Sequence, residues 1–176
     1  PMVCDVEDGT TASILGLDDV KVVEICTQSQ WVVVAANCNC PGQLVISGSV
    51  NALKSACENM RESGAKRAIL LPVGGAFHSP LMEPARVKLA NAIENTNFTS
   101  PICPVFQNVV AEAVTDSLAI KKNLVAQLTT SVRWTQTIEK MVAYGIKNFI
   151  EVGPGKVLQG LIKKINQETN ISSAKY

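Results

Sequence analysis

The chain has a single histidine, His78, and histidine is the side chain whose protonation naturally changes near neutral pH. It follows a predicted strand and the glycine pair Gly74-Gly75, and it comes just before a predicted helix. Loops at strand ends are where α/β folds place catalytic groups on a rigid scaffold. His78 is therefore a candidate general base, although its position alone favours the alternative of a surface or helix-capping histidine.

A histidine base needs a nucleophile to deprotonate, and no Gly-x-Ser-x-Gly turn occurs in the sequence. Ser47 and Ser49 flank a glycine, but the glycine spacing is wrong for that turn, and Ser79 adjoins the histidine without necessarily facing it. Cys38 or Cys40 would need a lowered thiol pKa, which nothing in the sequence indicates. The sequence thus offers a candidate base without a recognisable nucleophile.

A glycine-containing string at 151–158 could suggest a phosphate site at the start of a helix. Leu158 stands where a dinucleotide fingerprint requires glycine, and Val157 stands where a P-loop requires serine or threonine. The string therefore predicts a tight turn between a strand and a helix.

Neutral hydrogen-bonding side chains gather around Pro41-Gly42, namely Asn37, Asn39 and Gln43. They could bind an amide-rich ligand such as pantetheine, or they could simply fix a turn, and their spacing favours the turn.

Composition excludes several other classes of protein. The 176 residues are 47% apolar with a formal charge of +1 and no block of like charges, so we expect a folded protein that does not bind nucleic acid. No apolar run approaches the length of a membrane span, and no signal peptide is recognisable. The six cysteines lack the spacing of a metal site, so we expect reduced thiols, a cytoplasmic protein, and no metal or cofactor.

The first part of the chain alternates short apolar runs with helical patterns. Four strands are predicted, at 12–15, 31–36, 44–47 and 68–71. Two helices between them carry inward apolar residues: Val22, Val23 and Cys26 in the first, and Val50, Leu53, Cys57 and Met60 in the second. Residues 37–42 predict a turn between the second and third strands. Strand, helix, strand, strand, helix, strand is the order of a ferredoxin-like unit.

After residue 72 the pattern changes to longer helices separated by short strands. Helices are predicted at 81–94, 117–128, 134–144 and beyond Gly155, with strands at 104–109 and 147–152. The inward residues of the first helix are Met82, Ala85, Leu89 and Ile93, and those of the last are Val157, Leu158, Leu161 and Ile165. We expect α/β units on a mostly parallel sheet, and a tail after Glu168 that frays.

Four strings together resemble the malonyl-CoA:acyl-carrier-protein transacylase family of bacterial type II fatty acid synthesis. They are residues 11–17, 37–48, 75–82 and 151–158, which occur in the family's order and at its spacing. The resemblance implies an α/β fold in which residues 1–73 form a ferredoxin-like small subdomain. Residues 74–176 would then form the C-terminal portion of an α/β-hydrolase-like acyltransferase subdomain.

The resemblance also implies a reaction and roles for particular residues. The family moves malonyl from coenzyme A to the phosphopantetheine thiol of acyl carrier protein through an acyl-serine intermediate. His78 would be the general base and acid, and Gln127 would orient the imidazole through its backbone carbonyl. Asn37 and Asn39 would lie toward the substrate, and Phe77 would narrow the acyl pocket in favour of malonyl.

The family's serine turn, its Gly-Gln-Gly string and its carboxylate-binding arginine all precede the region that matches residues 11–17, and this sequence lacks them. Because the chain begins at Pro1, we expect an N-terminal half to be missing and the 176 residues alone to be inactive. Two alternatives remain: a non-catalytic module that binds carrier protein or coenzyme A, and an acyltransferase of different acyl specificity.

Overall fold

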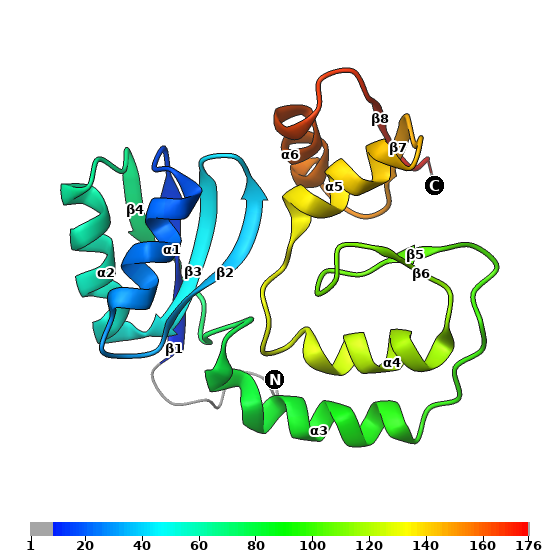
Figure 1. Cartoon of the computed structure of the whole chain (residues 1–176), viewed down its shortest axis with the longest axis horizontal. Coiled ribbons are helices and arrows are strands. Elements are labelled where there is room, and N and C mark those ends of the chain that lie inside the picture. Colours follow the sequence, from blue (N-terminus) through cyan, green and yellow to red (C-terminus); the bar gives the residue numbers. More distant parts are fainter. Residues whose placement is uncertain (1–8, 176) are drawn as a thin grey trace.

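The computed structural model describes residues 9–175, and its first part is an antiparallel sheet with two helices (Figure 1). The strands of this sheet are β1 (Gly9–Leu15), β2 (Val33–Cys40), β3 (Gln43–Ser49) and β4 (Arg67–Leu70), and its helices are α1 (Asp19–Gln28) and α2 (Val50–Glu62). The strands lie in the order β2-β3-β1-β4, and each neighbouring pair is antiparallel. The predicted order of elements in this part is confirmed.

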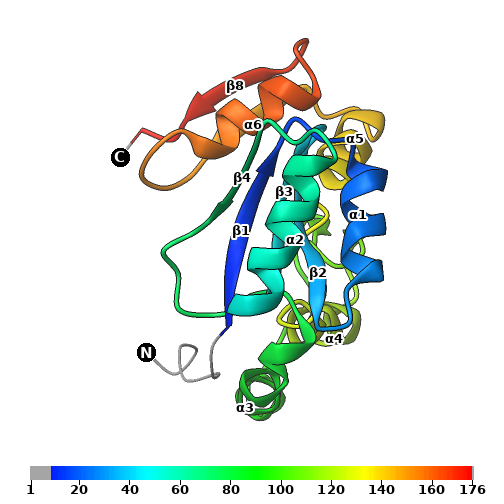
Figure 2. The same ribbon diagram turned by 90° about the vertical axis from the view of Figure 1, so that its left-hand side faces the viewer.

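Helices α1 and α2 pack on one face of the sheet, and the core lies between the two layers (Figure 2). Side chains such as Ile14, Ile46 and Leu53 are fully buried there. The prediction that Val23 faces inward is wrong, since its side chain is 45% exposed. Ile25 is buried in its place, because positions three and four residues after Val22 share its helix face whereas the next residue points away.

The predicted turn over residues 37–42 is also wrong, because β2 continues to Cys40 and only Pro41-Gly42 separates it from β3. A distant segment supports this longer strand. The Cys38 N–H donates to the Val132 carbonyl at 2.9 Å, and the Val132 N–H donates to the Ala36 carbonyl at 2.8 Å. These bonds satisfy backbone groups along the outer edge of β2 that a turn would otherwise have to satisfy.

The second part consists of helices with short, separate strand pairs. Its helical elements are η1 (Pro80–Met82), α3 (Glu83–Glu94), α4 (Ser117–Ala126), α5 (Trp134–Ala143) and α6 (Val157–Ile165). Its strands are β5 (Val105–Phe106), β6 (Ala113–Val114), β7 (Asn148–Glu151) and β8 (Asn170–Ser173). Helix α3 lies beside α4, and α5 and α6 pack against β2 (Figure 1).

Three predictions for this part need correction. Within residues 9–175 the mostly parallel sheet is absent, since β5 pairs only with β6 and β7 only with β8. The prediction of a frayed tail is wrong for residues 170–173, because β8 runs parallel to β7 and the Asn170 N–H bonds to the Lys147 carbonyl at 2.8 Å. Val157 and Leu158 are exposed, whereas Leu161 is buried as predicted, together with Ile162.

No helix in the described part of the chain is long and apolar enough to span a membrane.

Candidate functional site

His78 lies in the connection between β4 and η1, in a backbone conformation unusual for a residue with a side chain. Its φ is 57°, in the left-handed region that favours glycine. Two serine hydroxyls bond to this turn: Ser47 donates to the Phe77 carbonyl at 2.5 Å, and Ser79 donates to the Ala76 carbonyl at 2.6 Å. Ser79 also caps η1 by accepting the Leu81 N–H. Such strained conformations are characteristic of functional sites.

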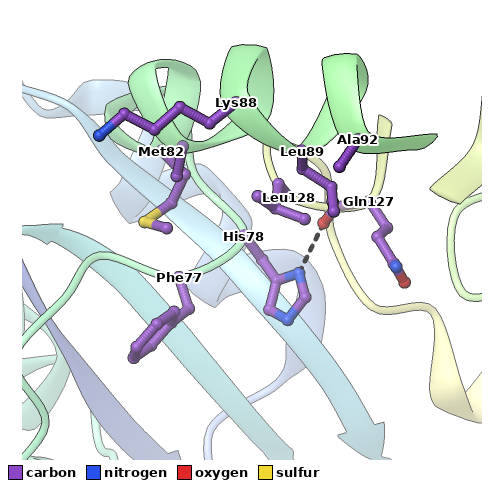
Figure 3. Close-up of a pocket in the computed structure, with 9 residues that line it drawn as sticks. Phe77, His78, Met82, Lys88, Leu89, Ala92, Gln127 and Leu128 are labelled. Carbon is purple, nitrogen blue, oxygen red and sulfur yellow. Dashed lines mark hydrogen bonds between the residues drawn. The ribbon is translucent and has the colours of Figure 1, made fainter. Parts of the chain in front are cut away.

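The imidazole of His78 reaches the backbone of Gln127, 49 residues further along the chain (Figure 3). Its Nδ1 lies 2.7 Å from the Gln127 carbonyl oxygen. A carbonyl can only accept, so Nδ1 carries the hydrogen of this bond. In the neutral ring Nε2 then has a free lone pair, which is what a general base requires.

Gln127 is held by both parts of the molecule. It follows the last residue of α4, and its N–H bonds to the Asn123 carbonyl at 3.0 Å. Five residues later the chain bonds to the edge of β2 through Val132. The Gln127 carbonyl is therefore fixed between α4 and the first sheet, in position to orient the imidazole.

A cavity of about 540 Å³ adjoins the histidine, beneath α3 (Figure 3). It is lined by Phe77, His78, Met82, Ala85, Lys88, Leu89, Ala92, Gln127 and Leu128. The sequence predicted Met82, Ala85 and Leu89 as an inward stripe, but it did not identify Lys88 or Ala92 as lining residues. Lys88 and Ala92 each lie three residues after a predicted inward residue, Ala85 or Leu89, and this helical spacing could have identified them.

The structure gives physical reasons to reject the alternative nucleophiles. The hydroxyls of Ser47 and Ser79 are buried and donate to backbone carbonyls. Burial raises the pKa of the Cys38 and Cys40 thiols, and a protonated thiol is a poor nucleophile.

Phe77 and the two asparagines lie in different settings. The Phe77 ring packs over Gly75, where an added Cβ would lie 3.2 Å from it, and it lines the cavity beside the histidine. Asn37 and Asn39 lie on β2, and Asn37 pairs with Val132 in an isolated bridge. In the part of the chain that the structure describes, neither asparagine lines that cavity. The structure thus brings together Phe77, His78 and Gln127, and it leaves the asparagines on the neighbouring strand.

The glycine-containing string after β7 has its helix N-terminus occupied by a carboxylate from the chain itself. Glu151 accepts the N–H groups of Leu158 and Gln159 at 3.1 and 3.4 Å. Gly153 and Gly155 both adopt positive φ, as a tight turn requires. This arrangement agrees with the predicted strand-to-helix turn and leaves these two N–H groups no role in holding a phosphate. Across residues 9–175, no group of three or more His, Cys, Asp or Glu residues could hold a metal ion.

This α/β chain, with a loop histidine whose ring contacts a backbone carbonyl, can be compared with known protein families. A family model described as acyl transferase domain matches residues 8–176. The chain therefore belongs to the acyl transferase family.

Particular relatives narrow the comparison. The malonyl CoA-acyl carrier protein transacylase of Bacillus subtilis (strain 168) is 44% identical over 163 residues, covering 91% of this chain and 51% of the relative. The protein of the same name from Staphylococcus aureus (strain MSSA476) is 41% identical over 168 residues, covering 94% of this chain and 54% of the relative. The chain thus spans about half the length of these curated relatives.

Solved structures have the same fold over nearly the whole chain. The crystal structure of an acyl carrier protein S-malonyltransferase from Vibrio cholerae O1 biovar eltor has a TM-score of 0.95 and 38% identity, covering 99% of this chain and 58% of that one. A malonyl-transacylase in complex with a type II PKS acyl-carrier protein has a TM-score of 0.89 and 38% identity, covering 95% of this chain and 54% of that one.

Proposed function

We propose that these residues form the histidine-bearing portion of a malonyl-CoA:acyl-carrier-protein transacylase of fatty acid synthesis. The observation that carries the proposal is the 2.7 Å contact between His78 Nδ1 and the Gln127 carbonyl. It joins two residues, distant in sequence, that the family resemblance assigns to one catalytic unit. The names of the relatives and of the solved structures support the same activity.

His78 moves one proton in each half-reaction. Its Nε2 takes the proton of a serine hydroxyl as the serine oxygen bonds to the malonyl carbonyl carbon. The same nitrogen returns the proton to coenzyme A sulfur when the carbon–sulfur bond breaks. The second half-reaction runs in reverse, with the phosphopantetheine thiol of acyl carrier protein attacking the acyl-serine. The Gln127 carbonyl orients the ring without adding a negative charge.

The serine of this mechanism lies outside these 176 residues, so the activity requires further residues of the family. Support comes from the relatives, about twice as long as the matched region, and from the exposed apolar side chains of the second part. Ile150 and Val152 are examples, at and just after the end of β7. Apolar surface left open to water is characteristic of a surface that another element covers.

The remaining assignments concern specificity and subdomains. The Phe77 ring would limit the width of the acyl pocket, and Asn37 and Asn39 would face the pantetheine part of the donor from β2. Residues 1–73 would form a ferredoxin-like small subdomain, supported by the β2-β3-β1-β4 order and the helices on one face. Residues 1–8 of that unit lie outside the described residues. Residues 74–176 would belong to the larger acyltransferase subdomain.

The test is malonyl transfer from malonyl-CoA to holo acyl carrier protein by the product of the whole reading frame. We expect His78→Ala to lower kcat by about 10²–10⁴-fold, the usual contribution of a general acid–base group. Labelling of the protein by malonyl-CoA should fall with it. Transfer at the parent rate by a folded His78→Ala protein would disprove the catalytic role of His78, and no transfer by the parent protein would disprove the function.

Gln127→Ala is the matched control, because it removes the side chain and keeps the carbonyl that contacts His78. We expect it to retain most of the activity. If Gln127→Ala is as damaging as His78→Ala, the backbone assignment fails.

A further inference from the structure

Ser47 is a buried polar residue that the proposed mechanism does not use. It lies on β3, with Thr11 of β1 on one side and Val34 of β2 on the other. On the same strand, Leu44 and Ile46 belong to the core beneath α1 and α2, whereas Ser47 does not. Successive residues of a strand point to opposite faces, so its hydroxyl is directed at the face opposite α1 and α2. Ser47 is 0% exposed, and its hydroxyl donates to the Phe77 carbonyl at 2.5 Å.

That carbonyl belongs to the peptide unit between Phe77 and His78. Rotation of a peptide unit changes the ψ of the residue before it and the φ of the residue after it together. The orientation of the Phe77 carbonyl and the positive φ of His78 are therefore linked. A residue with a side chain favours negative φ, so an unrestrained turn would relax by rotating this unit. The hydroxyl on the rigid central strand opposes that rotation.

The φ of His78 also sets the direction of its Cα–Cβ bond, and hence where the imidazole points. In the observed backbone conformation the ring meets the Gln127 carbonyl. We propose that Ser47 is a positioning residue, whose hydroxyl holds the 77–78 peptide so that His78 Nδ1 faces the Gln127 carbonyl. This inference rests on the proposed function for its purpose, but the geometry it describes can be tested without any acyl transfer.

The test uses the nitrogen resonances of the imidazole, which belong to one residue because His78 is the only histidine in the chain. In alkaline buffer we expect the nitrogen-15-labelled parent chain to give two well-separated resonances, from a protonated Nδ1 and an unprotonated Nε2. In Ser47→Ala the resonances should move toward each other, as the released ring exchanges between tautomers. A folded Ser47→Ala chain with unchanged resonances would overturn the proposal, as would a parent chain with the hydrogen on Nε2.

Two further variants separate positioning from general stability. Thr137→Val removes another buried hydroxyl, which donates to the Arg133 carbonyl at 2.8 Å within α5, and it should leave the resonances unchanged. Ser47→Thr keeps the hydroxyl and should restore the separation of the parent. If the folded Thr and Ala variants give the same spectrum, the hydroxyl does not hold the ring. If Ser47→Ala does not fold, Ser47→Cys replaces it, with a similar volume and a much weaker donor.

The two proposals can fail separately. Unchanged resonances in Ser47→Ala would remove the positioning role and leave malonyl transfer intact as a function. Full transfer by His78→Ala would remove the catalytic role of His78, and no transfer by the parent protein would remove the function, whatever the spectra show.

Discussion

The two parts of the molecule bury apolar side chains to different degrees. Every fully packed member of the main core cluster lies between Ala12 and Ala68, within the β1–β4 sheet and its two helices. In the second part, large apolar side chains such as Ile102, Ile150 and Val152 are exposed to water. The first part thus has a core of its own, whereas the second depends on its contacts with β2 and on whatever covers its apolar surface.

His78 lies between these two parts, and its surroundings come from both. Ser47 of β3 donates a hydrogen bond to the Phe77 carbonyl in the turn, and the Nδ1 of His78 contacts the carbonyl of Gln127 after α4. A substitution in either part can therefore displace the imidazole. The resulting loss in the free energy of unfolding should depend on which part carries the substitution. Predictions on stability test this contrast directly.

Truncation of a core residue should give the largest effect. Leu53 of α2 is 0% exposed, and Leu53→Ala removes buried methyl groups and leaves a cavity. We expect the free energy of unfolding to fall by about 2–5 kcal/mol, measured by urea denaturation with circular dichroism.

The matched change in the second part is Ile150→Ala on β7, whose parent side chain is 64% exposed. In these 176 residues its effect should stay within about 0.5 kcal/mol, since little apolar area is lost from a packed environment. If Leu53→Ala and Ile150→Ala lowered the free energy of unfolding equally, the difference in side-chain burial between the two parts would not produce a difference in stability.

Alkaline pH should weaken the first part through Cys26. Burial, with a smaller contribution from Cys57, raises the pKa of the Cys26 thiol from 9.0 to about 12. The folded protein therefore keeps a proton that the unfolded chain releases near pH 9. This contribution is complete below pH 9 and is lost as the pH rises toward 12, by about 2 kcal/mol between roughly pH 9 and pH 11. Urea unfolding across that range measures it.

Cys26→Ala should show a flatter dependence of stability on pH, because the titrating thiol is gone. Cys103→Ala should keep the parent's dependence, since Cys103 is exposed in the second part. A Cys26→Ala chain with the same pH dependence as the parent would contradict the buried-thiol explanation.

The sequence predicted the first part well, because alternation and helical spacing reflect a core that each element faces directly. It failed at residues 37–42, where the length of β2 depends on Val132, nearly a hundred residues away. It also failed at the tail, where β8 forms only because β7 lies beside it. Neither contact leaves a local pattern in the sequence.

The candidate site was predictable to a similar extent. His78 was chosen as a candidate because the chain has one histidine, in a glycine-containing turn before a helix. Gln127 came from family resemblance alone, because it contributes a backbone atom and any side chain could stand there. The sequence showed Ser47 only as a serine with the wrong glycine spacing, since its partner lies 30 residues away.

Glycine-to-alanine changes should change stability with opposite signs in the two parts. Gly48 lies in the middle of the first sheet, and an added Cβ would meet the Val32 carbonyl oxygen at 2.3 Å. Because that neighbour is backbone, Gly48→Ala should lower the free energy of unfolding by about 1–3 kcal/mol. Gly160 is exposed inside α6 with open space around it, so Gly160→Ala should raise stability by about 1 kcal/mol through helix propensity. Thermal unfolding of both variants measures the difference. A loss of stability in Gly160→Ala would mean that α6 is more tightly enclosed than its exposed residues indicate.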